Sequence, residues 1–96
     1  MNSSCTPREQ VMHHLKTWPT FFHEVCVGRK LFEVRKDDRD FQMGDTLVLE
    51  EWEPTTQEYT GRTISAEVTY ILRGPAFGIE SGTVVMSLEL GPMLDP

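Results

Sequence analysis

The chain has 96 residues, of which 39% are hydrophobic and 25% are charged. That length suits one domain with a single hydrophobic core, and the composition excludes an intrinsically disordered chain. No apolar run approaches the roughly 20 residues that cross a bilayer, and the polar start lacks a signal peptide, so we expect a cytoplasmic protein without a membrane partner. We predict one domain over residues 11–90, with loose tails at residues 1–10 and 91–96.

The cysteines and histidines do not form a known ligand pattern. Cys5 and Cys26 are too few for a disulfide scaffold and lack metal-ligand spacing, so we expect free thiols, with Cys26 in the core. His13, His14 and His23 contain no pair four residues apart with an accompanying glutamate. We therefore predict neither a metal site nor a cofactor.

The net charge of -6 is spread unevenly along the chain. Residues 28–39 carry five of the nine basic residues against three acidic ones, whereas residues 40–96 carry two basic and ten acidic groups, a balance of -8. A cationic segment in an acidic body suits a small anionic ligand or a short stretch of nucleic acid better than a long duplex. The alternative is a solvated charged strand and turn.

A short helix is predicted after a first strand at Val11–Leu15. Pro19 is tolerated at the first helical position, and Gly28 stands where a left-handed C-terminal cap is needed. Between them, apolar residues recur at helical spacing: Phe21, Phe22, Val25 and Cys26. We expect Trp18, Phe21 and Phe22 to belong to the core, with a base-stacking platform as the alternative.

Alternation with a period of two predicts the strands that follow. In Leu31–Lys36, Phe32 and Val34 share one face, and Leu31, Glu33 and Arg35 share the other, which we expect to point outward. Thr46–Trp52 is a second apolar stretch, and residues 53–62 are expected to form a hairpin loop.

The last two predicted strands show the clearest alternation. From Thr63 onward, five residues are expected to share the inner face: Ile64, Ala66, Val68, Tyr70 and Leu72. Thr83–Leu90 alternates again after a glycine-rich loop. About five closely spaced strands favour antiparallel pairing in a curled sheet or closed barrel, which removes exposed edges. We predict a mostly β, α+β barrel with one early short helix.

The segment from Gly28 to Arg35 contains the pattern G-x-K-x-x-E-x-R, through Gly28, Lys30, Glu33 and Arg35. This pattern resembles the signature of ASCH domains, relatives of the PUA fold. The likeness runs from His13 to about Leu88. Over this range the chain resembles an uncharacterised ASCH-like family common in bacteria and phages. It implies a small β-barrel whose charged cleft beside the early helix binds RNA or a nucleotide.

The resemblance and the charge pattern together select the candidate ligand-binding residues. Arg35 would clamp a phosphate or a base edge, Lys30 would supply a point charge, and Glu33 would accept from a base amino group. The remaining candidates are His13, Lys16, Gly28, Arg29 and Arg39. The alternative is that Glu33 pairs with Lys30 or Arg35 only to close the barrel mouth. Asp37, Asp38 and Asp40 are expected to shape a turn.

Two other functions stay open. Some ASCH proteins are similar to amidohydrolases that act on acylated cytidine, in which the motif lysine works with a threonine three residues later. Here Glu33 occupies that position, so catalysis would rest on Lys30 and Glu33 with a distant Glu67 or Glu80. The second is a phage-type inhibitor that binds a host protein through its acidic surface, although the same residues also confer solubility.

Overall fold

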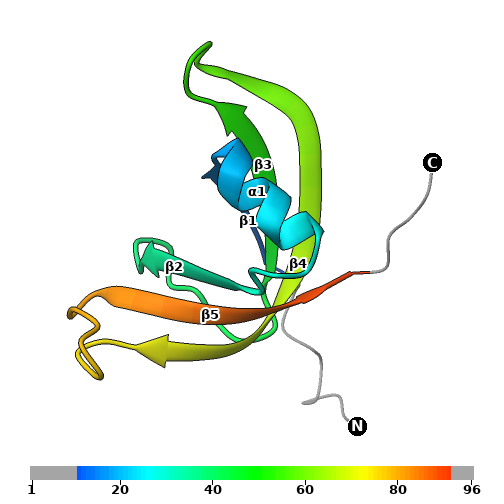
Figure 1. Cartoon of the computed structure of the whole chain (residues 1–96). Helices are drawn as coiled ribbons and strands as arrows, with labels where there is room; N and C mark the ends of the chain where they lie inside the picture. The colour runs from blue at the N-terminus through cyan, green and yellow to red at the C-terminus, as the bar shows by residue number, and fades with distance from the viewer. Residues whose placement is uncertain (1–10, 92–96) are drawn as a thin grey trace, which may run out of the picture.

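The computed structural model describes residues 11–91, and the predicted tails at residues 1–10 and 92–96, with Cys5, lie outside them. Figure 1 shows a strongly curled sheet with a single helix lying against it. The elements are β1 (Met12–Thr17), α1 (Pro19–Cys26), β2 (Phe32–Lys36), β3 (Thr46–Glu53), β4 (Glu58–Arg73) and β5 (Thr83–Leu90). The predicted mostly β fold with five strands and one early short helix is confirmed. No helix in this part of the chain is long and apolar enough to span a membrane.

The strand order is β1-β3-β4-β5-β2, so the first two strands of the chain form the two edges of the sheet. Three of the four pairings are antiparallel, but β1 pairs with β3 in parallel, with Met12 opposite Thr46. The expectation of antiparallel pairing throughout is wrong at this position. After β1 the chain passes through α1 and β2 before it returns beside β1, and such a crossover produces parallel strands.

The helix begins and ends where the sequence predicts. Pro19 follows Trp18, whose extended backbone (φ -67°, ψ 151°) leads into the first turn. At the other end Gly28 adopts φ +81°, and the Arg29 N–H donates to the Glu24 carbonyl at 2.9 Å, which closes a Schellman-type cap. This cap fixes the direction in which the chain leaves α1, and Lys30 follows directly.

The core lies between α1 and the inner face of the sheet. Phe22 and Val25 of α1 are fully buried and pack with residues of every strand except β2. Cys26 is partly buried against this cluster, as predicted. Trp18 and Phe21, expected in the core, are instead about half exposed and do not belong to this cluster.

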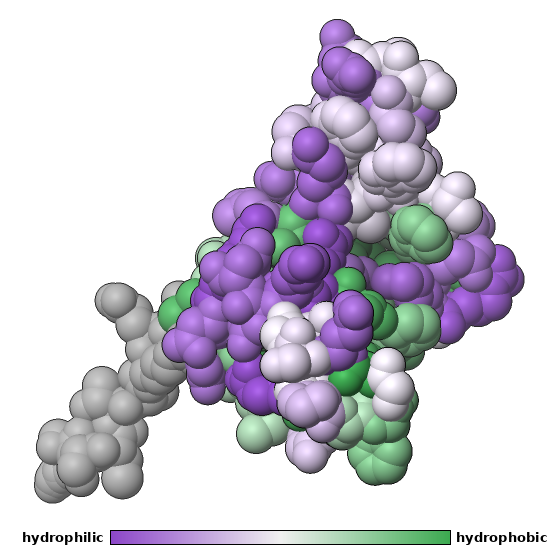
Figure 2. All heavy atoms as spheres, turned by 90° about the vertical axis from the view of Figure 1, so that its left-hand side faces the viewer, coloured by the Kyte–Doolittle hydropathy of each residue, from purple (hydrophilic) through white to green (hydrophobic). Residues whose placement is uncertain are grey.

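The two faces of β2 are the reverse of the expectation. Glu33 is buried at 3% exposure, whereas Phe32 and Val34 are 44% and 54% exposed. The predicted alternation is correct, but the face that carries Glu33 points inward, because its carboxylate pairs there with Lys30 and Arg35. Figure 2 shows a surface made mostly of hydrophilic residues, with some hydrophobic side chains exposed to solvent.

A β-bulge changes the predicted inner face of β4. Ile64, Ala66 and Val68 are buried as expected, but the register shifts between Val68 and Tyr70. Because a bulge adds one residue to the strand, Tyr70 turns outward at 59% exposure and Ile71 takes the core position.

Two arginine side chains, Arg35 of β2 and Arg39 of the turn that follows, reach β1 where no backbone pairing closes the sheet. The Arg35 guanidinium donates to the Lys16 carbonyl at 3.0 Å, and that of Arg39 donates to the His14 carbonyl at 2.7 Å. In β1 the carbonyls of alternate residues point to the same side, and the Val11 carbonyl accepts from Thr46 of β3. His14 and Lys16 therefore present their carbonyls to the free edge. The predicted barrel is a curled half-barrel, in which side chains rather than a strand pair bridge the gap.

A buried polar pair holds the turn before β3. His13 Nε2 lies 2.8 Å from Asp45 Oδ2, and the two side chains are 8% and 2% exposed. The same Asp45 oxygen accepts the Gln42 N–H at 3.0 Å, and the His13 ring meets Phe41 edge-on at 4.7 Å. His13 is thus a core residue, although the sequence predicted it as a ligand-binding residue.

We predict that Asp45→Ala lowers the free energy of unfolding by about 2 to 3 kcal/mol, because it leaves buried donors without an acceptor. Urea denaturation followed by circular dichroism measures this. Asp38→Ala is the matched control: Asp38 is exposed and pairs with Arg39 only at 3.6 Å, so its loss is expected to cost under about 0.5 kcal/mol. Equal effects of the two changes would contradict the structural role of Asp45.

Candidate ligand-binding cleft

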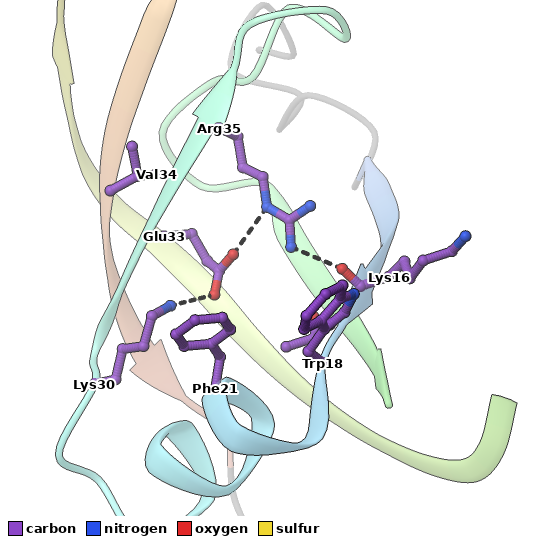
Figure 3. A pocket seen from close by; sticks show the side chains of 8 residues that line it. Lys16, Trp18, Phe21, Lys30, Glu33, Val34 and Arg35 are labelled. Carbon is purple, nitrogen blue, oxygen red and sulfur yellow. Dashed lines mark hydrogen bonds and ion pairs between the residues drawn. The ribbon is translucent and has the colours of Figure 1, made fainter. Parts of the chain in front are cut away.

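A cleft of about 430 Å³ opens between the start of α1, the end of β1 and the inner face of β2. It is lined by Lys16, Thr17, Trp18, Phe21, Lys30, Glu33, Val34 and Arg35. These residues come from two chain segments, residues 16–21 and 30–35, which the curled sheet brings face to face (Figure 3). The volume falls in the range of small-molecule sites in proteins.

The Glu33 carboxylate is the fixed point of the cleft. Its side chain is 4% exposed and accepts from two cations, Lys30 Nζ at 2.8 Å and Arg35 Nε at 2.9 Å, one on each oxygen. Burial of a single carboxylate without partners would cost several kcal/mol, so these two contacts are what allow Glu33 to lie there. In return the carboxylate orients both cationic side chains.

Each cation is held by a second contact and keeps donors to spare. Lys30 Nζ also donates to the Phe32 carbonyl at 2.9 Å, and Arg35 Nη2 donates to the Lys16 carbonyl. An ammonium has three donors and a guanidinium five, so at least one N–H of Lys30 and three of Arg35 have no acceptor among residues 11–91. Lys30 and Arg35 against the Glu33 carboxylate leave a charge of +1 at the cleft.

Aromatic faces form the opposite side of the cleft. Trp18 and Phe21 are 52% and 51% exposed, and Figure 3 shows both rings beside the Glu33 ion pairs. The Lys30 ammonium lies 5.9 Å from the centre of the Phe21 ring, near the limit of a cation–π contact. The Lys16 ammonium instead sits 4.1 Å from the centre of the Trp52 ring. A flat ligand placed in the cleft would therefore meet ring surface and positive charge together.

The structure brings together four of the eight predicted site residues: Lys16, Lys30, Glu33 and Arg35 all line the cleft. His13 lies in the core, and Gly28 serves in the helix cap. Arg39 is bonded to the His14 carbonyl at the open edge of the sheet. Its neighbour Asp37 does shape the turn, as predicted, because its carboxylate accepts the Phe41 N–H at 3.0 Å.

Arg29 is committed to a partner outside the cleft. Its Nε and Nη2 donate to the two carboxylate oxygens of Glu24 at 2.7 and 2.8 Å. This hydrogen-bonded pair lowers the pKa of Glu24 below its ordinary value and raises that of Arg29, so both groups are charged at neutral pH. The bidentate contact holds Arg29 to Glu24, and Arg29 does not line the cleft.

The predicted site residues leave out four of the lining residues: Thr17, Trp18, Phe21 and Val34. Trp18 and Phe21 were considered only as the alternative of a base-stacking platform. Pro19 was the available signal, because it marks the start of α1, and Thr17, Trp18 and Phe21 lie on either side of that start. Nothing in the alternation of β2 indicated that Val34 borders the cleft.

The geometry of Lys30 suits binding better than base catalysis, because its ammonium already donates to a carboxylate and a carbonyl. Neither Glu67 nor Glu80, considered as distant catalytic partners, lines the cleft. Within residues 11–91, no three His, Cys, Asp or Glu side chains gather to form a metal site.

Two comparisons with known proteins match this chain. A family model described as a domain of unknown function (DUF3850) matches residues 12–88, which include every lining residue. A protein of Escherichia phage P2, described as an uncharacterized 12.9 kDa protein in the GpA 3' region, is 40% identical over 58 residues. That match spans 60% of this chain and 51% of the phage protein, so the chain corresponds to about half of the length of this relative.

We predict that Glu33→Gln lowers the free energy of unfolding by about 3 kcal/mol, because Lys30 and Arg35 would then face each other without a carboxylate. Thermal and urea unfolding check this result. Glu67→Gln, at an exposed position of β4, is the control and is expected to change stability by less than about 0.5 kcal/mol. A Glu33→Gln protein as stable as the control would show that the two ion pairs do not hold the cleft.

Proposed function

The chain belongs to the DUF3850 family, and from the geometry of the cleft we propose that it binds single-stranded RNA or a nucleotide. The observation that carries this proposal is the pairing of two half-exposed aromatic rings with cations that a buried carboxylate holds in place. Rings supply stacking surface for bases, and cations supply contacts for phosphates.

The unused donors favour an anionic ligand. Both oxygens of Glu33 already accept from cations, whereas Lys30 and Arg35 line the same cleft and retain N–H groups without an acceptor among residues 11–91. A phosphate accepts several such hydrogen bonds at once, and a guanidinium suits it geometrically. The role expected for Glu33, accepting from a base amino group, therefore gives way to orientation of the two cations.

The size and charge of the protein limit the ligand to a short one. The cleft carries +1 within a chain of net charge -6, so phosphates beyond the cleft would meet an acidic surface. A duplex that crosses the whole molecule would gain little, whereas one or two unpaired nucleotides would fit the positive region.

The resemblance to ASCH domains supports the same function. Of the four motif residues, Lys30, Glu33 and Arg35 converge in the cleft, and Gly28 forms the cap that delivers them. A PUA-like assignment would account for the curled sheet and for the place of the cleft beside the early helix. The ligand would then be one that is met in the cytoplasm.

We predict that Trp18→Ala and Phe21→Ala each weaken binding of single-stranded RNA by about tenfold to a hundredfold, the usual contribution of one stacked base. Fluorescence anisotropy with labelled eight-nucleotide RNAs measures the affinity. Tyr59→Ala is the control, because Tyr59 is also more than half exposed but lies outside the cleft. If no RNA and no nucleotide binds the unmodified protein at low salt, the proposal is wrong.

The salt dependence of binding should be shallow. One or two cleft cations that neutralise phosphates predict a slope of the logarithm of affinity against that of salt concentration between about -0.7 and -1.4. Titrations of the same RNAs at several salt concentrations give this slope. A slope near zero would indicate that the cleft cations do not contact phosphate, and a much steeper one would indicate a surface larger than the cleft.

A further inference from the structure

The alternation of hydrogen bonds between β2 and β5 decides which backbone groups of β2 face the cleft. β2 pairs with β5, and the Leu88 N–H donates to the Leu31 carbonyl at 3.0 Å. In an antiparallel ladder, directly bonded pairs alternate with unbonded ones. Leu31, Glu33 and Arg35 are therefore bonded to β5, whereas Phe32, Val34 and Lys36 turn their N–H and carbonyl groups to the free edge.

Along this free edge, only Val34 keeps both backbone groups available in the described part of the chain. The Phe32 carbonyl accepts from Lys30 Nζ, and the Lys36 carbonyl accepts from the Asp38 N–H at 2.9 Å. No hydrogen bond from residues 11–91 reaches the edge-facing groups of Val34. One donor and one acceptor thus remain side by side.

The main chain of Val34, not its side chain, borders the cleft. Val34 is among the lining residues, yet Figure 3 shows its side chain on the opposite side of β2 from Glu33 and Arg35. That side chain belongs to the exposed outer face of the sheet. The free N–H and carbonyl therefore lie in the wall that stands between Lys30 and Arg35.

We propose that the Val34 backbone reads the edge of one unstacked nucleobase whose face lies against Trp18 or Phe21. A base edge offers a donor beside an acceptor, as in the amino group and ring nitrogen of adenine or cytosine, and can pair with both groups of one residue. This inference rests on the proposed function and names what the same cleft recognises: a single base, in addition to its phosphate.

An extended peptide that adds a strand to β2 is the competing occupant, and the structure disfavours it. Strand addition needs a run of alternate residues with free backbone groups. Here the carbonyls on either side of Val34 are already occupied, so a peptide would gain at most one residue of ladder. A planar base needs no more than that, and the neighbouring rings serve a base better than a backbone.

The first test observes the amide of Val34 directly. The isotopically labelled unmodified protein is titrated with AMP, CMP, GMP and UMP, and with ribose 5-phosphate as the ligand that lacks a base. We expect at least one nucleotide to shift the Val34 amide resonance strongly, and ribose 5-phosphate to perturb Lys30 and Arg35 without that shift. Nucleotides that perturb the cleft but leave the Val34 amide unchanged would overturn this inference and leave the proposed function standing.

The second test removes one hydrogen bond from the ligand or from the protein. AMP is expected to bind about tenfold more tightly than purine riboside 5′-monophosphate, and CMP than its analogue without the 4-amino group, as for one lost hydrogen bond. If the Val34 amide responds only to GMP or UMP, the paired analogue is the base methylated at its ring N–H. Equal affinities within every pair would contradict the inference.

Val34→Pro removes the edge-facing N–H, which an edge strand tolerates. It is expected to weaken binding of every nucleotide that shifts the Val34 amide by about tenfold while leaving ribose 5-phosphate unaffected. Lys36→Pro makes the same backbone change outside the cleft and should retain the preference for nucleotide over ribose 5-phosphate. Should Val34→Pro fail to fold by circular dichroism, the analogue pairs with the unmodified protein decide the question. No binding of any nucleotide would overturn this inference, and only the additional absence of RNA binding would reject the proposed function itself.

Discussion

The buried Glu33 carboxylate decides how the second half of the site is built. Strand alternation alone allows β2 to turn either face inward, and the apolar Phe32 and Val34 would be the ordinary choice for the core. The observed choice places a charge inside, which is stable only because Lys30 and Arg35 supply one cation to each oxygen. The arrangement gives up apolar burial on β2 and gains a rigid pair of cations at a cleft.

Arg35 also contacts a free edge of the sheet. An open sheet leaves backbone groups exposed at both edges, and such edges invite unwanted pairing. Here the guanidinium groups of Arg35 and Arg39 occupy two carbonyls of β1, so the edge at β1 is partly covered without a continuous strand ladder. Arg35 thus belongs at once to the closure of the sheet and to the cleft, and a ligand that engages it acts on both.

Much of this arrangement follows from the sequence because it is local. The limits of α1 depend on Pro19 and Gly28, and strand alternation identifies β2 and β5 within a residue or so. The G-x-K-x-x-E-x-R pattern correctly brought Lys30, Glu33 and Arg35 together. What failed depends on distant partners: the inward face of β2, the outward turn of Tyr70 at a bulge, the parallel pairing of β1, and the pairing of His13 with Asp45. None of these leaves a signal within a short window of sequence.

The position of β1 at the edge of the sheet has a consequence for the order of folding. Its hydrogen-bond partner, β3, lies far along the chain, with Met12 opposite Thr46, so β1 has no strand to join until β3 exists. A long loop must therefore close before Lys16 and Trp18 can take their final places. A molecule held between Trp18 and Arg35 would tie this edge strand to the rest of the sheet, and mass action would then favour the completed fold.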